Sequence, residues 1–127
     1  VAQKGDPIEQ FPTPANIGGT DPNSTGISIT SGNRITFANA GTYTVTFSIQ
    51  FQNTDTSASA NDNVDVWLRK NGTDIPYSNN IYNIPLSKGG TNGTLVSTTP
   101  FTLTLNAGDY IQVVWAVSNT TISVCAA

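Results

Sequence analysis

Three aspartates that lie close together along the chain are the best candidates for chemistry in this sequence. Asp55, Asp62 and Asp65 fall in or beside the polar stretch 53–62, where Asn, Thr and Ser supply further oxygen atoms. Carboxylate and amide oxygens are the ligands that Ca²⁺ prefers, so these three residues are the candidate metal ligands. Asp and Asn also hydrogen-bond to the backbone of turns, and a solvated loop without a metal is the simpler interpretation.

The residue types that most enzyme mechanisms need are missing or unpaired. The 127 residues include no histidine, which removes the commonest general base and leaves any Ser or Cys nucleophile without that base. Glycosidases need two carboxyl groups that face each other across a cleft, and the spacing of the eight acidic residues singles out no such pair. We therefore expect a protein that is not an enzyme and that uses no cofactor.

The composition favours strands and hydrogen-bonded turns. About a third of the residues are Thr, Asn or Ser, and 10% are charged, against the usual quarter. The net charge of −3 offers no basic surface for nucleic acid, and no apolar run is long enough to insert into a membrane. The single cysteine, Cys125, cannot form an internal disulfide and is expected to be a small apolar side chain on the last strand.

The elements that position these residues are strands, and the clearest one runs from Tyr43 to Gln52. Its apolar side chains occupy alternate positions, and Thr, Ser and Gln occupy the positions between them. Successive side chains of a strand point to opposite faces, so this strand has one face against a core and one face in water. A one-sided strand of this length needs a second layer to cover it.

Further alternating stretches predict an all-β protein with eight or more short strands, as in a two-sheet antiparallel jelly-roll sandwich. The other strands are expected at 26–30, 34–37, 63–70, 73–77, 81–86, 100–105, 110–117 and 121–125. Asn71-Gly72, between two strand patterns, is the strongest hairpin signal. The positions expected to face the core are Tyr43, Val45, Phe47, Ile49, Phe51, Val66, Leu68, Leu103, Leu105, Ile111, Val113 and Trp115.

The first part of the chain differs in composition from the rest. Residues 1–26 are rich in Pro, Gly, Asp and Asn, which predicts an extended arm with an edge strand around Ile8 to Phe11. Such an arm could tether the domain to a larger body or lie as a strap on its surface, and the strap is favoured because Ile8 and Phe11 need cover. The jelly-roll domain is then expected over 27–127.

Two of the expected strands are apolar on both faces. In 110–117 the face opposite the core is largely apolar, and in 63–70 Trp67 lies opposite the core face, between Asp65 and Arg69. A strand that is apolar on both sides is covered on both sides. The second cover comes either from other copies of the chain, which we favour because most soluble oligomers are homo-oligomers, or from the arm.

Three blocks of the sequence resemble the complement-type globular head and tumour necrosis factor superfamily. Residues 35–45 are similar to its F-x-x-x-G-x-Y-x-V block, residues 64–72 to its V-x-L-x-K-N-G hairpin, and residues 101–111 to its L-x-L-x-x-G-D-x-V block. Each block is weak alone, and their order and spacing make the set more specific. Residues 67–76 look most like the versions found in bacteriophage and other viral fibre, spike and head-decoration proteins.

The resemblance implies a tumour necrosis factor-like jelly roll of ten strands that assembles as a tight homotrimer around the outer faces of 63–70 and 110–117. The trimer-interface residues are then Trp67, Arg69, Tyr110, Gln112, Val114 and Ala116. The family usually ends in an aromatic-containing strand, whereas this sequence ends at Cys125-Ala126-Ala127, so the last strand is either abbreviated or continued in the natural protein.

The expected function follows from this resemblance. The chain would be a module of the virion surface whose partners are its own copies, other virion proteins and a host cell-surface glycan or protein. Binding residues concentrate on loops held by a rigid scaffold, and the candidate recognition residues are Tyr77, Tyr82, Gly90 and Asn92. A purely architectural capsid-decorating or cement protein is the main alternative, and a secreted cytokine-like or lectin-like ligand is a further one.

Overall fold

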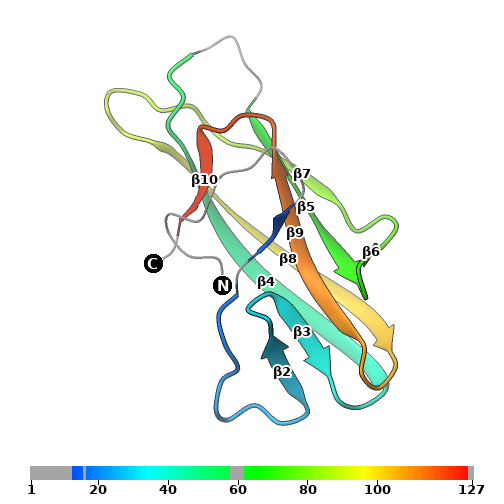
Figure 1. Cartoon of the computed structure of the whole chain (residues 1–127). Helices are drawn as coiled ribbons and strands as arrows, with labels where there is room; N and C mark the ends of the chain where they lie inside the picture. The colour runs from blue at the N-terminus through cyan, green and yellow to red at the C-terminus, as the bar shows by residue number, and fades with distance from the viewer. Residues whose placement is uncertain (1–12, 16, 58–61, 126–127) are drawn as a thin grey trace.

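Two antiparallel β-sheets make up the part of the chain that the computed structural model describes, residues 13–15, 17–57 and 62–125 (Figure 1). The described residues contain no helix long and apolar enough to cross a membrane. The edge strand expected around Ile8 to Phe11 lies outside the described residues. The strands are β1 (Thr13–Pro14), β2 (Ile27–Thr30), β3 (Arg34–Phe37), β4 (Gly41–Asn53), β5 (Asn63–Lys70), β6 (Thr73–Asp74), β7 (Asn80–Asn83), β8 (Gly93–Leu105), β9 (Tyr110–Val117) and β10 (Ile122–Cys125).

The two sheets differ in size and share one core. The larger sheet has seven strands, in the order β2-β3-β9-β5-β6, with β1 also pairing with β9 and β7 with β5. The smaller sheet has three strands, in the order β10-β4-β8. Phe51 of β4 and Ile122 of β10 belong to the same hydrophobic cluster as Val64 of β5 and Trp115 of β9. The predicted all-β class is therefore confirmed, and the architecture has the character of a β-sandwich.

The ladder between β4 and β8 is the longest in the molecule's described part. Both strands have 13 residues, and they pair from Gly41 opposite Leu105 to Asn53 opposite Gly93. The apolar side chains of β4 face the larger sheet, as the alternation predicts, and its Thr, Ser and Gln side chains face outward. Cross-strand threonine pairs such as Thr42 and Thr104, whose Oγ1 atoms are 3.2 Å apart, line the outward face.

The strand β8 begins earlier than the sequence predicts, at Gly93 rather than at residue 100. Two inward positions in its first half are polar, which removes the apolar alternation that identifies a strand. Ser97 is 1% exposed, and Oγ1 of Thr99 is hydrogen-bonded to the hydroxyl of Tyr82 at 2.9 Å. Half of β8 could therefore be recognised only from its neighbours in the fold.

The hairpin after β5 forms where the sequence predicts it. Asn71 and Gly72 both have positive φ, 50° and 84°, as a type I′ turn requires. The return strand is shorter than expected, since β6 ends at Asp74 and Pro76 follows as a residue without an N–H to donate. The expected strand 81–86 is also displaced, to Asn80–Asn83.

The core consists of a large cluster between the sheets and a smaller one near Phe37. Trp115 is 2% exposed, and its ring centroid is 6.1 Å from that of Phe51. The smaller cluster joins Phe37 to Leu105 and Ile111. Every residue expected to face the core belongs to one of these two clusters, either buried or packed against it.

The chain joins the larger sheet before residue 27, where the domain was expected to begin. In the pairing of β1 with β9, Pro14 lies opposite Val114. The N–H of Ala15 donates to the carbonyl of Val113 at 2.7 Å, and Ala15 itself is buried in the main cluster. The middle of the predicted arm therefore contributes a short strand to the larger sheet.

Candidate interaction surface

The outer face of the larger sheet carries the residues predicted to form a trimer interface. In the ladder between β5 and β9, Trp67 lies opposite Val114, and Arg69 lies opposite Gln112. Residues directly opposite each other in an antiparallel pair share a face, and alternate residues of β9 over 110–116 share it as well. The backbone register by itself brings the six predicted residues together.

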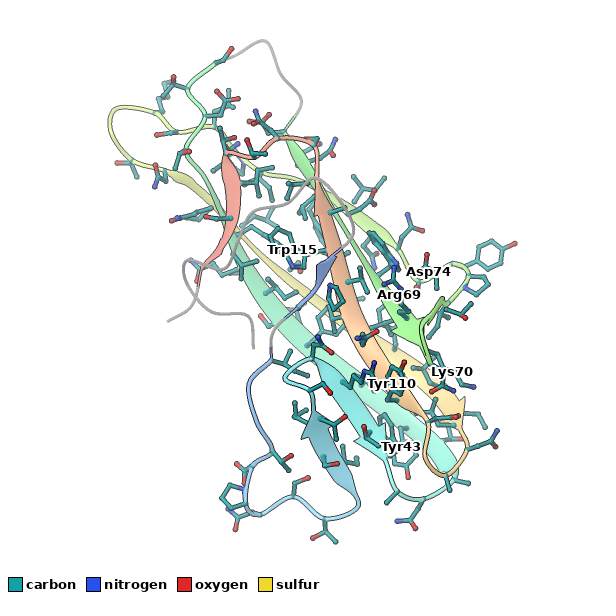
Figure 2. All side chains as sticks on the ribbon, viewed as in Figure 1. Tyr43, Arg69, Lys70, Asp74, Tyr110 and Trp115 are labelled. Carbon is teal, nitrogen blue, oxygen red and sulfur yellow. The ribbon has the colours of Figure 1, made fainter. Side chains whose placement is uncertain are left out.

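Asp74 of β6 orients two of these side chains. Its Oδ1 accepts hydrogen bonds from Nε1 of Trp67 at 2.9 Å and from Nε of Arg69 at 2.8 Å. Figure 2 shows Arg69 and Asp74 beside each other. The hydrogen bond from Arg69, with that from Trp67, lowers the pKa of Asp74 below its ordinary value. The sequence held a signal for this contact, because a two-residue Asn71-Gly72 turn places residue 69 opposite residue 74.

Arg34 of β3 extends the surface beyond the predicted residues. Its guanidinium carbon lies 4.4 Å from the centroid of the Tyr110 ring, within the range of a cation–π interaction. The contact forms because β3 pairs with the start of β9, where Thr36 lies opposite Tyr110. No local sequence pattern indicates that pairing. We call Arg34, Trp67, Arg69, Asp74 and Tyr110 the outer cluster.

Two of the six predicted interface residues need a correction. Val114 is 0% exposed and Gln112 is 7% exposed within the single chain. Val114 lies between Trp67 on β5 and Pro14 on β1, and Nε2 of Gln112 donates to Oδ1 of Asn33 at 3.0 Å. These two residues lie beneath the surface of the face, while Trp67, Arg69, Tyr110 and Ala116 are half-buried and keep part of their surface exposed.

The candidate recognition residues do not come together. Tyr77 is fully exposed in the turn between β6 and β7, with φ at 61°. Tyr82 faces the core, where its hydroxyl bonds to Thr99. Gly90 and Asn92 lie in the loop between β7 and β8, which Figure 1 shows on the opposite side of the molecule from the turn after β6. Tyr77 is therefore the one aromatic of this set that is available to a ligand.

Two of the three candidate metal ligands meet, and the third does not. Nδ2 of Asn119 donates to Oδ2 of Asp55 at 3.0 Å and to Oδ1 of Asp62 at 3.2 Å. Asp65 lies on β5 opposite Ala116, on the outer face of the larger sheet. Within the described ranges, no group of three or more His, Cys, Asp or Glu side chains is placed to hold a metal ion.

The two aspartates belong to a buried polar network around Asn53. Asn53 is 0% exposed, its Nδ2 donates to Oδ2 of Asp62 at 2.8 Å, and its Oδ1 accepts a hydrogen bond from Oγ1 of Thr121 at 2.9 Å. The same Oδ1 accepts the N–H of Asp55 at 2.9 Å. The network ties the end of β4 to the segments that lead into β5 and β10, which is a structural role for residues first considered as ligands.

The ionisation of the Asp62 carboxyl is expected to make the free energy of unfolding depend on pH. Its burial would raise the pKa, but hydrogen bonds with Asn53, Asn119 and Asp55 outweigh burial and hold the pKa of Asp62 below its ordinary value. A carboxyl whose pKa is lower in the folded state stabilises the protein above the unfolded pKa of about 3.9. That stabilisation disappears as the pH falls through the folded pKa.

We therefore expect the free energy of unfolding to fall as the pH is lowered below about 4, and to fall less steeply in the Asp62→Asn variant. Urea denaturation at a series of pH values measures both slopes. The variant should also be less stable than the unsubstituted protein at pH 7. Equal slopes for the two proteins would show that the network does not favour the charged form of Asp62.

The outer cluster and the Asn53 network are thus different kinds of site, one on the surface of the larger sheet and one internal to the fold. Trp, Tyr and Arg are the side chains that most often contribute binding energy at protein interfaces, and the outer cluster gathers all three types. No model of a known protein family matches this sequence, and no curated protein is similar to it.

Proposed function

We propose that this chain is a non-enzymatic structural module of a virus particle, a fibre, spike or head-decoration domain that forms a jelly-roll homotrimer and attaches the particle to a host surface. The viral setting is supported by the resemblance of residues 35–45, 64–72 and 101–111 to the blocks described above. The all-β architecture with two antiparallel sheets is compatible with that fold.

The outer cluster is the observation that carries the proposal. Trp67 and Tyr110 are large, half-buried aromatic side chains on a sheet face, and each is held by a polar or cationic neighbour. Side chains that are already oriented lose little conformational entropy when a partner binds, which favours affinity. A face of this kind suits the contact between copies around a threefold axis.

Trimerisation would determine how attachment works. Three copies would present three identical loop sets on one axis, and each additional contact would form at a high effective concentration. Tyr77 is the loop residue best placed to contribute, because its side chain is fully exposed and its backbone is held in the left-handed region. Backbone strain of this kind is found at binding sites more often than elsewhere.

The Trp67→Ala variant is expected to dissociate the trimer at concentrations where the unsubstituted protein stays assembled. Truncating an aromatic hot spot costs about 2 kcal/mol, which corresponds to about a thirtyfold weaker association. Sedimentation velocity over a range of protein concentrations measures the change. Val96→Ala is the control, because Val96 is 59% exposed on the outer face of the other sheet. A monomer at every concentration, or an unchanged trimer in Trp67→Ala, would refute the proposal.

Attachment itself is tested with the purified protein on host cells and on a glycan array. Saturable binding that Tyr77→Ala weakens, with the oligomer intact, supports a receptor-binding role. Binding to assembled particles alone would instead identify an architectural, capsid-decorating protein.

A further inference from the structure

The strand β4 is paired along only part of one edge. Its pairing with β8 extends over its whole length, whereas β10 covers the other edge only from Gln50 to Asn53. Among the described residues, none pairs with that edge over 41–49. No described strand therefore uses the main-chain donors and acceptors of this stretch, which suit pairing with another strand.

The core beneath this stretch is incompletely covered. Ile49 and Phe51 of β4, which lie near or beside β10, are 5% and 0% exposed. Tyr43, Val45 and Phe47 face the same core from the uncovered part of β4, yet they are only half-buried. The loss of burial begins where β10 ends, which indicates that one more strand would complete the smaller sheet.

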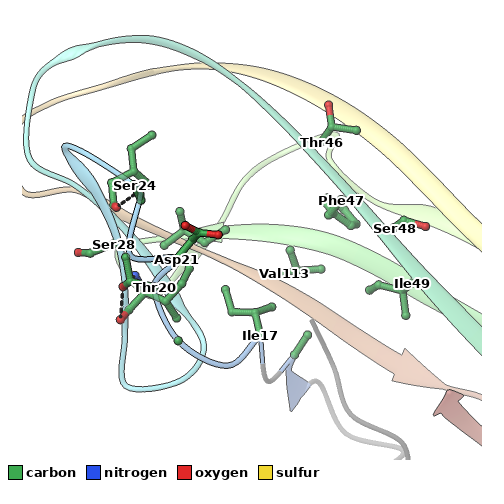
Figure 3. Close-up of a pocket in the computed structure, with 15 residues that line it drawn as sticks. Ile17, Thr20, Asp21, Ser24, Ser28, Thr46, Phe47, Ser48, Ile49 and Val113 are labelled. Atoms are coloured by element: carbon green, nitrogen blue, oxygen red, sulfur yellow. Dashed lines mark hydrogen bonds between the residues drawn. The ribbon is translucent and has the colours of Figure 1, made fainter. Parts of the chain in front are cut away.

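A pocket of about 490 Å³ lies directly against this edge (Figure 3). Four consecutive residues of β4, from Thr46 to Ile49, line it. Side chains on both faces of a strand can border one pocket only if the pocket adjoins the edge of the strand. Its floor is apolar, with Ile17 and Val113 among the lining residues. This size and character suit the binding of apolar side chains.

The opposite wall of the pocket is polar, and its Thr20 hydroxyl already has a hydrogen-bond partner. Thr20 accepts a hydrogen bond from the N–H of Ile29 on β2 at 2.7 Å, which closes part of that strand's edge. Asp21 is the single charged residue among the described residues that line the pocket. Figure 3 shows Thr20, Asp21 and Ser24 on one side of the pocket and the β4 residues on the other. A basic side chain is the charge complement of this wall.

The two long free edges of the smaller sheet are protected differently. β8 carries Pro100 in its middle, and proline on an edge strand discourages pairing with another chain. β4 has neither a proline nor a charged residue between Gly41 and Asn53. Residues 1–12 are poorly suited to cover the whole stretch, because Pro7 and Pro12 leave runs of six and four residues that can donate to a ladder, both shorter than 41–49.

We call the open edge of β4 over 41–49 and the adjoining pocket the groove. We propose that the groove binds an extended segment of a different protein chain by strand addition. The segment would pair with the open edge over 41–49, insert apolar side chains at alternate positions into the pocket, and place a Lys or Arg near Asp21. Main-chain hydrogen bonds supply affinity in this mode of recognition, and the side-chain pocket supplies specificity. This inference does not depend on trimerisation or on a viral setting.

A synthetic nine-residue peptide tests the proposal. The probe alternates valine and threonine and carries a lysine at one end, and its control has proline in place of the central valine. Fluorescence anisotropy should show binding of the probe and at least tenfold weaker binding of the proline peptide. Asp21→Asn should weaken binding of the probe about two- to fivefold, as expected for an exposed ion pair. Trp67→Ala should bind the probe normally, which separates this site from the outer cluster.

Hydrogen exchange locates the contact on the full chain. The probe should slow amide exchange within 41–49, whereas the proline peptide should leave it unchanged. Failure of the probe to bind, or equal binding of both peptides, would overturn the proposal. Slow exchange, without any peptide, of the amides in 41–49 that point away from β8 would also overturn it. If that protection rises with protein concentration, a second copy is the occupant, and if it is lost on removing residues 1–12, the chain's own leading segment is.

Discussion

Replacing Trp115 by alanine is expected to lower the free energy of unfolding by about 3–5 kcal/mol. Trp115 is 2% exposed on β9 and belongs to the main cluster with residues of both sheets. Its removal loses the transfer free energy of the indole ring and leaves a cavity that Phe51, its nearest ring neighbour, can fill only in part. Urea denaturation followed by circular dichroism measures the change.

Tyr77→Ala is the matched aromatic control for this experiment. Tyr77 is 101% exposed, so its truncation removes no core contact and should change stability by no more than about 0.5 kcal/mol. A loss below about 1.5 kcal/mol in Trp115→Ala would mean that the two sheets do not close over this residue. The packing of the two sheets against each other around Trp115 would then be wrong.

Gly93→Ala is expected to destabilise the protein by about 3 kcal/mol or more, although it adds only one methyl group. Gly93 begins β8 opposite Asn53, and a Cβ at this position would overlap the carbonyl group of Pro85. Backbone cannot yield as a flexible side chain can, so either β8 or the segment around Pro85 must shift. Thermal unfolding together with urea denaturation measures the loss.

Gly19→Ala provides the control for this second experiment. A Cβ on Gly19 meets no atom within 4 Å, and its backbone is outside the left-handed region. The change should therefore leave stability within about 0.5 kcal/mol of the unsubstituted protein. A Gly93→Ala variant as stable as Gly19→Ala would contradict the close approach of Pro85 to the start of β8.

The two surfaces proposed above as binding sites are separate. The outer cluster lies on the larger sheet, and the groove lies between the sheets beside the open edge of β4. Residues of one are not residues of the other, so variants such as Trp67→Ala and Asp21→Asn can test them independently. A module of this kind could contact its own copies through one surface and a different chain through the other.

The strands and their core faces follow from the sequence where alternation is strict. Tyr43 to Phe51 alternate without interruption, and the strand that contains them faces the core as expected. The Asn71-Gly72 pair predicts its hairpin equally well, because few residue pairs tolerate positive φ at both positions. These are local features, which depend on the period of a strand and the conformational preferences of one turn.

Features that depend on segments far apart in the chain were decided only by the tertiary structure. The first half of β8 is a strand because β4 pairs with it, despite the polar Ser97 and Thr99 at inward positions. Arg34 reaches Tyr110 because β3 pairs with β9, and Asn119 joins Asp55 to Asp62 from the turn before β10. Composition and spacing could suggest that the aspartates were ligands, but their hydrogen-bond partners come from other strands. Alternation and turn chemistry act within a few residues, whereas the choice of strand neighbours depends on how the two sheets bury their shared core.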